Sequence, residues 1–331
     1  MKEPKFAMII DVVGDNRKSY YVKNNKAYTL NNDPYEFGIS IGNEFYISIW
    51  NYPWLYDNGY FLNWVDFGDD LPTLDLDLIF LSIEKQLLNP DFTVDKIRKK
   101  YPKAKIVGLI KEIWMGPPYD YNHPKHIARI EFLNQCDHIV TNRPELKEFT
   151  QIAENVDKPL NFVAIPVNID YLYDNYYKEK ELALWAYIPN PMDRRGTTYD
   201  FAQYISEKYK IPVKYKPLIN GQRFDYMSQK EFIDNWSSCA FHLNLDPIDY
   251  FPGNQCPLVA ATGTINIGGV NDYHHLLYPK TATCDWEILE NEIVSYINNP
   301  ESRNAVIENA WDELNKTFSF EAVKKQIENI I

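Results

Sequence analysis

Short apolar runs alternate with segments of helical periodicity along most of the chain. In the first half, runs rich in β-branched and aromatic residues predict strands, and apolar residues spaced three or four apart predict the helices between them. The run Asp77–Ile83 is almost continuously apolar, which is typical of a strand covered on both faces of a parallel sheet. The predicted strands are 6–13, 44–50, 77–83, 104–110, 137–140 and 160–165, and the predicted helices are 93–100, 123–135 and 144–153.

The pattern is interrupted once, by the polar and aromatic segment Asn168–Glu181, and then starts again. Strands that alternate with helices indicate βαβ units and parallel sheets. We therefore predict an α/β chain of two Rossmann-like domains facing across a cleft, with an N-terminal domain over 1–168, a linker over 169–181 and a C-terminal domain over 182–331. In this second half the predicted strands are 182–188, 212–216, 240–245 and 264–267, and the predicted helices are 198–209, 228–237, 256–262, 286–298, 301–316 and 320–331.

The composition is that of an ordinary globular protein and excludes several classes. With 331 residues, 45% of them hydrophobic and 24% charged, the chain is long enough for two cores. The four cysteines lie far apart and form no C-x-x-C pair, so neither a disulfide scaffold nor a structural zinc motif is predicted. No apolar run reaches the length of a membrane span or of a signal-peptide core, and we expect a cytoplasmic chain.

Two loops of the second half combine polar side chains with free backbone N–H groups. The first is Pro189–Gly196, which lies between a predicted strand and a predicted helix. The start of a helix offers unpaired N–H groups and the positive end of the helix dipole, and Arg194 and Arg195 add two cations there. This combination is suited to binding a diphosphate.

The second loop follows the predicted strand 240–245 and leads into a short helix and a turn at Gly263. Asp246 begins this loop, and Asn254 and Gln255 stand directly before the helix. Amide side chains and exposed N–H groups in this position are suited to a ribose and its phosphates.

The order of these elements resembles the nucleotide-sugar-binding domain of GT-B glycosyltransferases of the group 1 type. Arg194-Arg195-Gly196 is similar to the basic loop that follows the first strand of that domain. Ser238–Leu245 is similar to a late strand, and Leu258–Ile267 to the turn and strand after it. The closing segments, 277–297 and 303–331, follow the family pattern as well. The resemblance covers 182–331 and, more weakly, 104–167, and its specificity lies in the order and spacing of the motifs.

The resemblance implies an enzyme that moves a hexosyl or pentosyl group from a UDP- or GDP-linked sugar to an acceptor, with no metal and no further cofactor. Fixed cations and a helix N-terminus would stabilise the negative charge that develops on the departing diphosphate. The donor-binding residues that it implies are Arg194, Arg195, Gly196, Lys216, Asp246, Asn254 and Gln255.

The chain departs from the family at one motif. Retaining members carry an E-x7-E motif, whose two positions are occupied here by Tyr250 and Leu258. The stereochemical outcome therefore stays open, and Asp246, Asp249 or Gln255 would have to replace a carboxylate. An inverting reaction needs a general base in the N-terminal domain. The candidates near predicted strand ends are Glu112, Asp11, His123 and Glu84, with Glu112 and Asp11 ranked first.

Charge along the chain bears on the acceptor. The whole chain carries a net charge of −12, which disfavours unspecific binding to nucleic acid or an anionic membrane. Val94–Arg129, in contrast, holds nine basic residues against three acidic ones. We predict that this segment binds the acceptor through Lys99, Lys100, Trp114 and Tyr119. The acceptor classes that this leaves are a glycan, a lipid-linked sugar and, less favoured because of the overall negative charge, a modified base of DNA.

Three alternatives stay open. Asp75-Leu76-Asp77 matches the D-x-D metal motif of the GT-A fold, although it begins a predicted strand instead of ending one. A sugar-nucleotide epimerase or a phosphorylase would share the two-domain shape, and a non-catalytic sugar- or nucleotide-binding protein would share the loops. No G-x-G-x-x-G follows the first strand, so a dehydrogenase is not expected.

Overall fold

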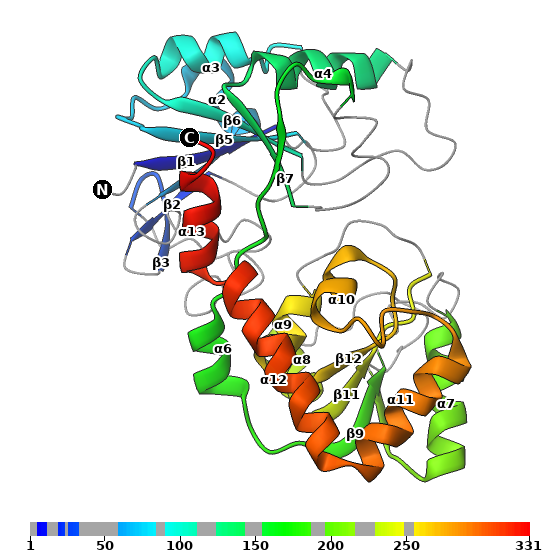
Figure 1. Cartoon of the computed structure of the whole chain (residues 1–331). Helices are drawn as coiled ribbons and strands as arrows, with labels where there is room; N and C mark the ends of the chain where they lie inside the picture. The colour runs from blue at the N-terminus through cyan, green and yellow to red at the C-terminus, as the bar shows by residue number, and fades with distance from the viewer. Residues whose placement is uncertain are drawn as a thin grey trace. The chain divides into compact units, whose positions relative to one another are not determined.

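The computed structural model describes residues 5–11, 19–23, 26–32, 59–83, 90–110, 124–142, 154–186, 196–215, 229–247 and 255–331. The chain divides into two compact units, Met1–Pro166 together with Phe320–Ile331, and Val167–Ser319. Each unit contains a largely parallel sheet with helices packed on it (Figure 1). The predicted α/β class is confirmed.

The sheet of the first unit is built around buried parallel strands. The chain pairs in the order β3-β2-β4-β1-β5-β6-β7-β8, and only β2 pairs antiparallel with its neighbours. Every residue of β1 is buried, because the sheet is covered on both faces where this strand lies. The strands are β1 (Phe6–Ile10), β2 (Tyr20–Lys23), β3 (Lys26–Thr29), β4 (Tyr60–Asn63), β5 (Leu78–Ile83), β6 (Lys105–Ile110), β7 (His138–Thr141) and β8 (Leu160–Phe162).

The helices described in the first unit are α2 (Trp64–Phe67), η2 (Gly68–Asp70), α3 (Val94–Lys100), α4 (Pro124–Gln135) and α13 (Phe320–Glu328). α3 and α4 lie side by side along the sheet, and α13 lies apart from them (Figure 1). The side-chain oxygen of Gln326 in α13 accepts a hydrogen bond from the backbone N–H of Ala164 at 2.8 Å. This bond ties the end of the chain to the first unit.

The second unit has a four-stranded, entirely parallel sheet in the order β10-β9-β11-β12. All five residues of β11, at its centre, are buried. The strands are β9 (Glu181–Ala186), β10 (Val213–Tyr215), β11 (Cys239–Leu243) and β12 (Ile265–Ile267), and the helices are α6 (Ile169–Tyr176), α7 (Gly196–Tyr209), α8 (Gln229–Ser237), α9 (Gln255–Ala261), α10 (Asp272–Leu277), α11 (Trp286–Asn298) and α12 (Pro300–Thr317).

Most of the predicted elements that fall on described residues are present, with ends shifted by a few residues. The strands predicted at 182–188 and 240–245 are β9 and β11, and the helix predicted at 198–209 is α7. The strand predicted at 44–50 and the helix predicted at 144–153 lie outside the described residues. β2, β3, β4, α2 and α10 were not predicted, because they are four to six residues long and offer too few positions to show a period.

The structure differs from the predicted domain limits in two places. The segment predicted as a linker contains α6, which packs against α8 and α9 and buries Ile169, Leu172 and Tyr176. These residues are spaced by three and then four positions, so they form one buried face of a helix. The tyrosines and acidic residues between them prevented the recognition of this apolar face in the sequence. The second difference is α13, which was predicted in the C-terminal domain and belongs to the first unit.

The D-x-D motif has a structural role. Asp75 accepts a hydrogen bond from the Lys5 ammonium at 2.6 Å, and Asp77 accepts one from the Lys5 backbone N–H at 3.0 Å. Lys5 directly precedes β1 and Asp77 directly precedes β5, so these contacts fix the starts of two neighbouring strands.

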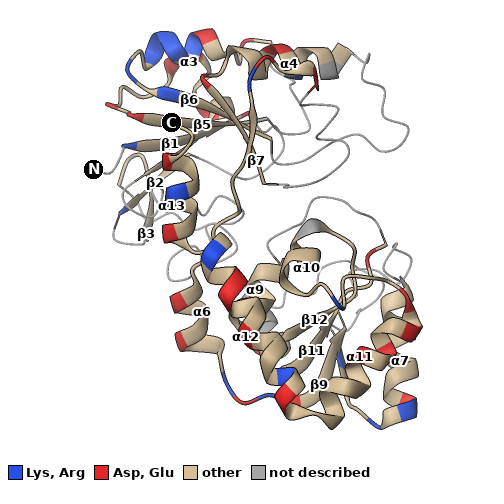
Figure 2. Cartoon of the chain, in the orientation of Figure 1, with Lys and Arg blue, Asp and Glu red and all other residues tan. Residues whose placement is uncertain are grey.

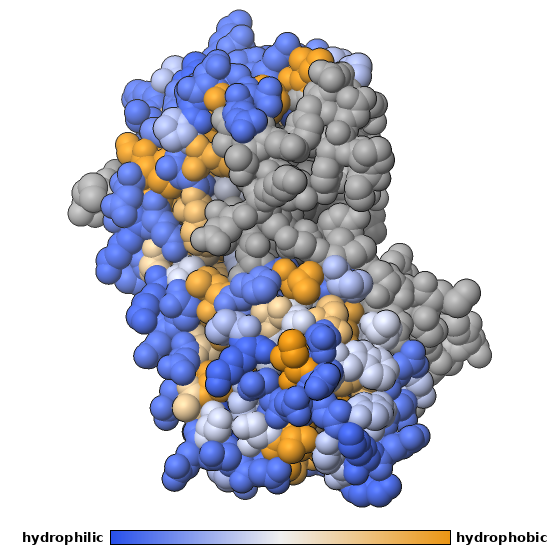
Figure 3. Space-filling model, turned by 45° about the vertical axis from the view of Figure 1, so that its right-hand side comes forward, coloured by the Kyte–Doolittle hydropathy of each residue, from blue (hydrophilic) through white to orange (hydrophobic). Residues whose placement is uncertain are grey.

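The face of the molecule drawn in Figure 3 is largely hydrophilic where its residues are described. The face shown in Figure 3 carries scattered hydrophobic residues among polar ones. Large exposed hydrophobic residues such as Val65, Ile127 and Ile288 lie on three different helices. None of the helices in the described ranges combines the length and apolar character that crossing a membrane requires.

A cluster around Glu290 joins α11 to α7. The Glu290 carboxylate accepts hydrogen bonds from the Tyr204 hydroxyl at 2.7 Å, the Lys208 ammonium at 2.5 Å and the Tyr209 hydroxyl. These bonds, above all the one from Lys208, lower the pKa of Glu290 to about 2. The cluster helps to fix α7, whose first residue is Gly196.

We expect Glu290→Gln to lower the melting temperature near pH 7 by a few degrees more than Glu287→Gln, a change at an exposed site of the same helix. Folding lowers the pKa of Glu290, so its contribution is complete above the ordinary value of 4.5 and is lost as the pH falls towards about 2. The difference in melting temperature between wild type and Glu290→Gln should therefore narrow below about pH 4.5. Thermal unfolding followed by circular dichroism measures it, and a difference that is constant down to pH 3 would contradict the prediction.

Candidate functional site

Several chain segments leave the carboxyl edge of the second unit's sheet. Ala186, the last residue of β9, pairs with Leu243, and Leu243 pairs with Ile267 of β12. The three strands therefore end level with one another. The described residues that follow them, Asn244–Pro247 and Gly268–Asn271, are thus brought to one edge. In parallel α/β sheets, ligands bind at this edge.

A hydrogen bond joins α7 to this edge. The backbone N–H of Leu245 donates to the Thr198 hydroxyl at 3.0 Å, and both residues are fully buried. Thr198 lies in the first turn of α7, and Leu245 directly precedes Asp246. The bond therefore places Gly196 and the buried Asp246 on neighbouring segments.

A buried polar network lies beneath the edge. His242 and Asn266 pair across β11 and β12, and their side chains meet at 2.8 Å between Nδ1 and Oδ1. Because Asn266 Oδ1 can only accept, His242 Nδ1 donates, and Nε2 accepts from the Gln255 amide at 3.1 Å. The imidazole of His242 is therefore neutral. Gln255 also accepts from the Asn244 amide at 3.5 Å, so the network fixes the side chain that begins α9.

The turn after β12 is closely packed. Gly268 and Gly269 have φ angles of 89° and 87°, which favour glycine. A Cβ atom at Gly268 would lie 2.8 Å from Leu245 Cδ1, and one at Gly269 would lie 2.9 Å from His274 Nδ1. His274 is buried, and its ring nitrogens have no hydrogen-bond partner in the part of the chain that the structure describes. Burial, with smaller effects of His242 and His275, lowers the pKa of His274 to about 3.

Cys284 adds a thiol to the same place. Burial raises the pKa of this thiol, a hydrogen bond from the Gly269 N–H opposes the rise, and the Asp246 carboxylate adds to it. Cys284 is half-buried, whereas Cys136, Cys239 and Cys256 are buried.

The structure thus brings three of the predicted donor residues, Gly196, Asp246 and Gln255, to one edge. Four others, Arg194, Arg195, Lys216 and Asn254, lie outside the described residues, although the two arginines directly precede α7 in the sequence. Sequence analysis missed Asn244, Asn266, His274 and Cys284. Single polar residues at strand ends, in a short helix or in a loop give no pattern. The pairing of β11 with β12 brings Asn244 and Asn266 together, and contacts with Gly269 bring His274 and Cys284 to the same edge.

The corresponding edge of the first unit holds Asp11. This buried residue follows β1 directly, and the preceding Ile10 pairs with the buried Ser82 of β5. Thr141 and Asn142, at the end of β7, are buried as well. Glu84, Glu112 and His123, the other candidate bases, lie outside the described residues. Ser82, Thr141 and Asn142 were not proposed from the sequence, because isolated polar residues at strand ends resemble ordinary turn residues.

Lys99 and Lys100 lie elsewhere. They occupy the last turn of α3, only a few residues before the start of β6, and so lie near the amino edge of the sheet instead of the edge that holds Asp11. Figure 2 shows the basic residues gathered on α3. The other predicted acceptor residues, Trp114 and Tyr119, are outside the described residues.

Comparison with solved structures identifies the fold. Trehalose-6-phosphate synthase OtsA is similar to this chain with a TM-score of 0.55 and 11% sequence identity. The match covers 76% of this chain and 71% of the OtsA chain. For HepE of Anabaena, solved with UDP, the match covers 77% of this chain and 78% of the HepE chain, with a TM-score of 0.52 and 10% identity. For a glycosyltransferase of Rickettsia africae it covers 77% of this chain and 76% of the other, with a TM-score of 0.51 and 10% identity. The chain has a GT-B glycosyltransferase-like fold. This GT-B-like fold is the one that the order of elements led us to expect.

Sequence comparisons gave no further relatives. No protein-family model matches the chain, and no curated protein matches its sequence.

We expect Gly269→Ala to destabilise the protein by about 1–3 kcal/mol, because the new Cβ meets both an unfavourable φ and the His274 ring. Gly68→Ala is the matched control, since Gly68 has a φ of 53° but nothing within 4 Å of its Cβ position. Thermal unfolding gives the overall effect, and hydrogen exchange in α10 reports the local one. Equal exchange in α10 for the two variants would contradict the packing described for His274.

Proposed function

We propose that the protein is a glycosyltransferase that moves a hexosyl or pentosyl group from a UDP- or GDP-linked sugar to a glycan or lipid-linked sugar. The observation that carries this proposal is the Leu245–Thr198 hydrogen bond, because it joins the start of α7 to the segment of Asp246 in a chain with a GT-B-like fold. The structures of HepE in complex with UDP and with UDP-glucose support the choice of donor class.

In this proposal the diphosphate binds at the start of α7. This helix is 14 residues long, and its first N–H groups and the two preceding arginines, Arg194 and Arg195, supply positive charge to the departing group. Gln255, fixed by His242, and Asp246 are placed to bind hydroxyl groups of the ribose or the sugar. Lys216 and Asn254 complete the proposed donor set.

The proposal assigns the general base to the first unit. Asp11 is the described candidate, and its burial at a strand end suits a carboxylate that must take a proton from an acceptor hydroxyl. For the acceptor we propose the segment after β6, which carries Glu112, Trp114 and Tyr119, because Ile110 ends β6 at the same edge at which Ile10 ends β1.

Arg195→Ala should abolish binding of the donor, because it removes one of the two cations proposed for the diphosphate. Thermal shift with UDP, UDP-glucose and GDP-mannose identifies the bound nucleotide, and release of free UDP or GDP in the presence of acceptor extracts measures transfer. Lys316→Ala, at the far end of α12, is the control for loss of one positive charge and should behave as wild type. Wild-type binding by Arg195→Ala would refute the donor site, and conversion of the donor without release of nucleoside diphosphate would indicate an epimerase.

UDP should protect Cys284 from alkylation by N-ethylmaleimide, because the thiol lies beside Gly269 and near Asp246 at the proposed donor edge. Peptide mass spectrometry measures the rate at Cys284, and the three buried cysteines serve as internal references. Protection should be lost in Arg195→Ala. Equal labelling rates with and without UDP, at UDP concentrations that raise the melting temperature, would place the nucleotide elsewhere.

A further inference from the structure

A cavity opens at the edge of this sheet that lies opposite the proposed donor edge. It has a volume of about 410 Å³, within the range of small-molecule sites. Its lining comes from Tyr177–Lys180, which link α6 to β9, from Ala240 and Gly263 near the starts of β11 and β12, and from α12. These residues precede or begin their strands, whereas the proposed donor edge follows the strand ends.

The cavity has more positive than negative charge in its lining. It contains three cations, Lys178, Lys180 and Arg303, and one acid, Glu179, whose side chain is exposed. Lys178 forms an ion pair with Asp234 at 3.5 Å. Neither of the other two cations has a carboxylate partner among the described residues.

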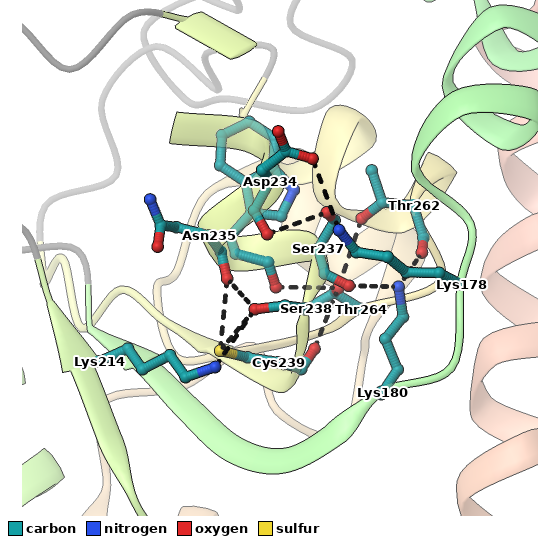
Figure 4. Close-up of polar contacts among 11 residues, drawn as sticks. Lys178, Lys180, Lys214, Asp234, Asn235, Ser237, Ser238, Cys239, Thr262 and Thr264 are labelled. Atoms are coloured by element: carbon teal, nitrogen blue, oxygen red, sulfur yellow. Dashed lines mark hydrogen bonds and ion pairs between the residues drawn. The ribbon is translucent and has the colours of Figure 1, made fainter. Parts of the chain in front are cut away.

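Lys180 is held by carbonyl groups instead of carboxylates. Its ammonium donates to the carbonyl oxygen of Ser237 at 2.7 Å and to that of Thr262, at the ends of α8 and α9 (Figure 4). An ammonium has three N–H donors, so these two bonds leave one. Burial, with a smaller effect of Lys178, lowers the pKa of Lys180 to about 8. The carbonyls at two helix ends offset part of its charge but bring no full negative charge.

Arg303 supplies the second uncompensated cation. It lies in the first turns of α12, where the positive end of the helix dipole adds to its charge, and it is half-buried. None of its side-chain N–H groups has a partner within the described residues. A guanidinium fork of this kind matches the geometry of a phosphate.

The remaining lining consists of the polar side chain of Asn304 and of Tyr177, Ala240, Gly263 and Ile307, and it is shaped by a close approach. Gly263 has a φ of 72°, and a Cβ atom there would lie 2.3 Å from the Tyr177 ring. The absence of a side chain at Gly263 therefore lets Tyr177 lie against the turn, beside Ala240 and Ile307 of the cavity wall.

We propose that this cavity binds a small phosphorylated molecule, with the phosphate held by Arg303 and Lys180 and the rest of the molecule against Tyr177 and Ile307. This anion site is independent of the proposed glycosyl transfer, because it shares no residue with the donor edge. The volume exceeds that of a bare phosphate, and for this reason we assign a phosphorylated small molecule in preference to inorganic phosphate.

Glycerol 3-phosphate and inorganic phosphate serve as probes, and glycerol serves as the neutral control, in isothermal titration calorimetry of the whole chain. We expect glycerol 3-phosphate to bind more tightly than phosphate, and Arg303→Met to weaken both by about tenfold or more. Arg303→Lys keeps the charge and should retain part of the affinity. Binding should also weaken as the pH rises through about 8, because Lys180 then loses its proton.

The Arg195→Ala variant distinguishes binding in this cavity from binding at the proposed donor edge. If the anion binds in this cavity, Arg195→Ala binds glycerol 3-phosphate as wild type does. An effect of Arg195→Ala without an effect of Arg303→Met would locate the anion at the donor edge and overturn the proposal, as would a lack of saturable binding. Lys180→Met can unfold two helix ends, so the conclusion depends on the Arg303 variants, whose folding is checked by circular dichroism.

Discussion

Leu184 of β9 pairs with Phe241 of β11, and Phe241 pairs with Ile265 of β12, so that three strands run in one direction through a single buried layer. Side chains alternate between the two faces along a strand, and both faces here are covered. A slip by one residue would exchange the faces of every side chain and would part His242 from Asn266. The parallel register therefore fixes two opposite edges at once. Strand ends meet at one edge and strand starts at the other, and each candidate site depends on this level alignment.

The two edges differ in their electrostatics. Beneath the carboxyl edge the two buried imidazoles are neutral, since His242 is held as a neutral imidazole and burial keeps the pKa of His274 near 3. Neutral dipoles can orient a ligand but cannot balance the negative charge of a diphosphate. A donor site at this edge therefore needs the N–H groups at the start of α7 and the positive charges of Arg194 and Arg195. At the amino edge, Lys180 and Arg303 are part of the cavity lining itself. An anion with fewer negative charges than a diphosphate would be sufficient to balance these two cations.

The sequence predicted the parts of the fold that rest on long periodic runs. β5, β6, β9 and β11 are predominantly apolar segments, and α7, α11 and α12 have the spacing of amphipathic helices. It did not predict α6, because the buried stripe of that helix includes a tyrosine between charged residues. The placement of α13 depends on tertiary contacts such as Gln326 with Ala164, which are separated by 162 positions and leave no local signal.

The same contrast, between what a local sequence pattern shows and what only tertiary contacts bring about, applies to the residues of the two candidate sites. The position of Gly196, Asp246 and Gln255 at one edge of the sheet could be predicted, because each residue follows or precedes a recognisable element and strand order then brings the three together; their role in donor binding stays a prediction. Lys180, in contrast, lies in the segment that pattern analysis assigned to a linker, where a lysine among charged neighbours is typical of a solvated surface. Its significance comes from the two carbonyls of Ser237 and Thr262 that surround it in the folded chain. A net charge of −12 describes the whole chain and not this cavity, whose lining contains three cations and one exposed acid. Neither Lys180 nor Arg303 forms an ion pair with a carboxylate of the described residues.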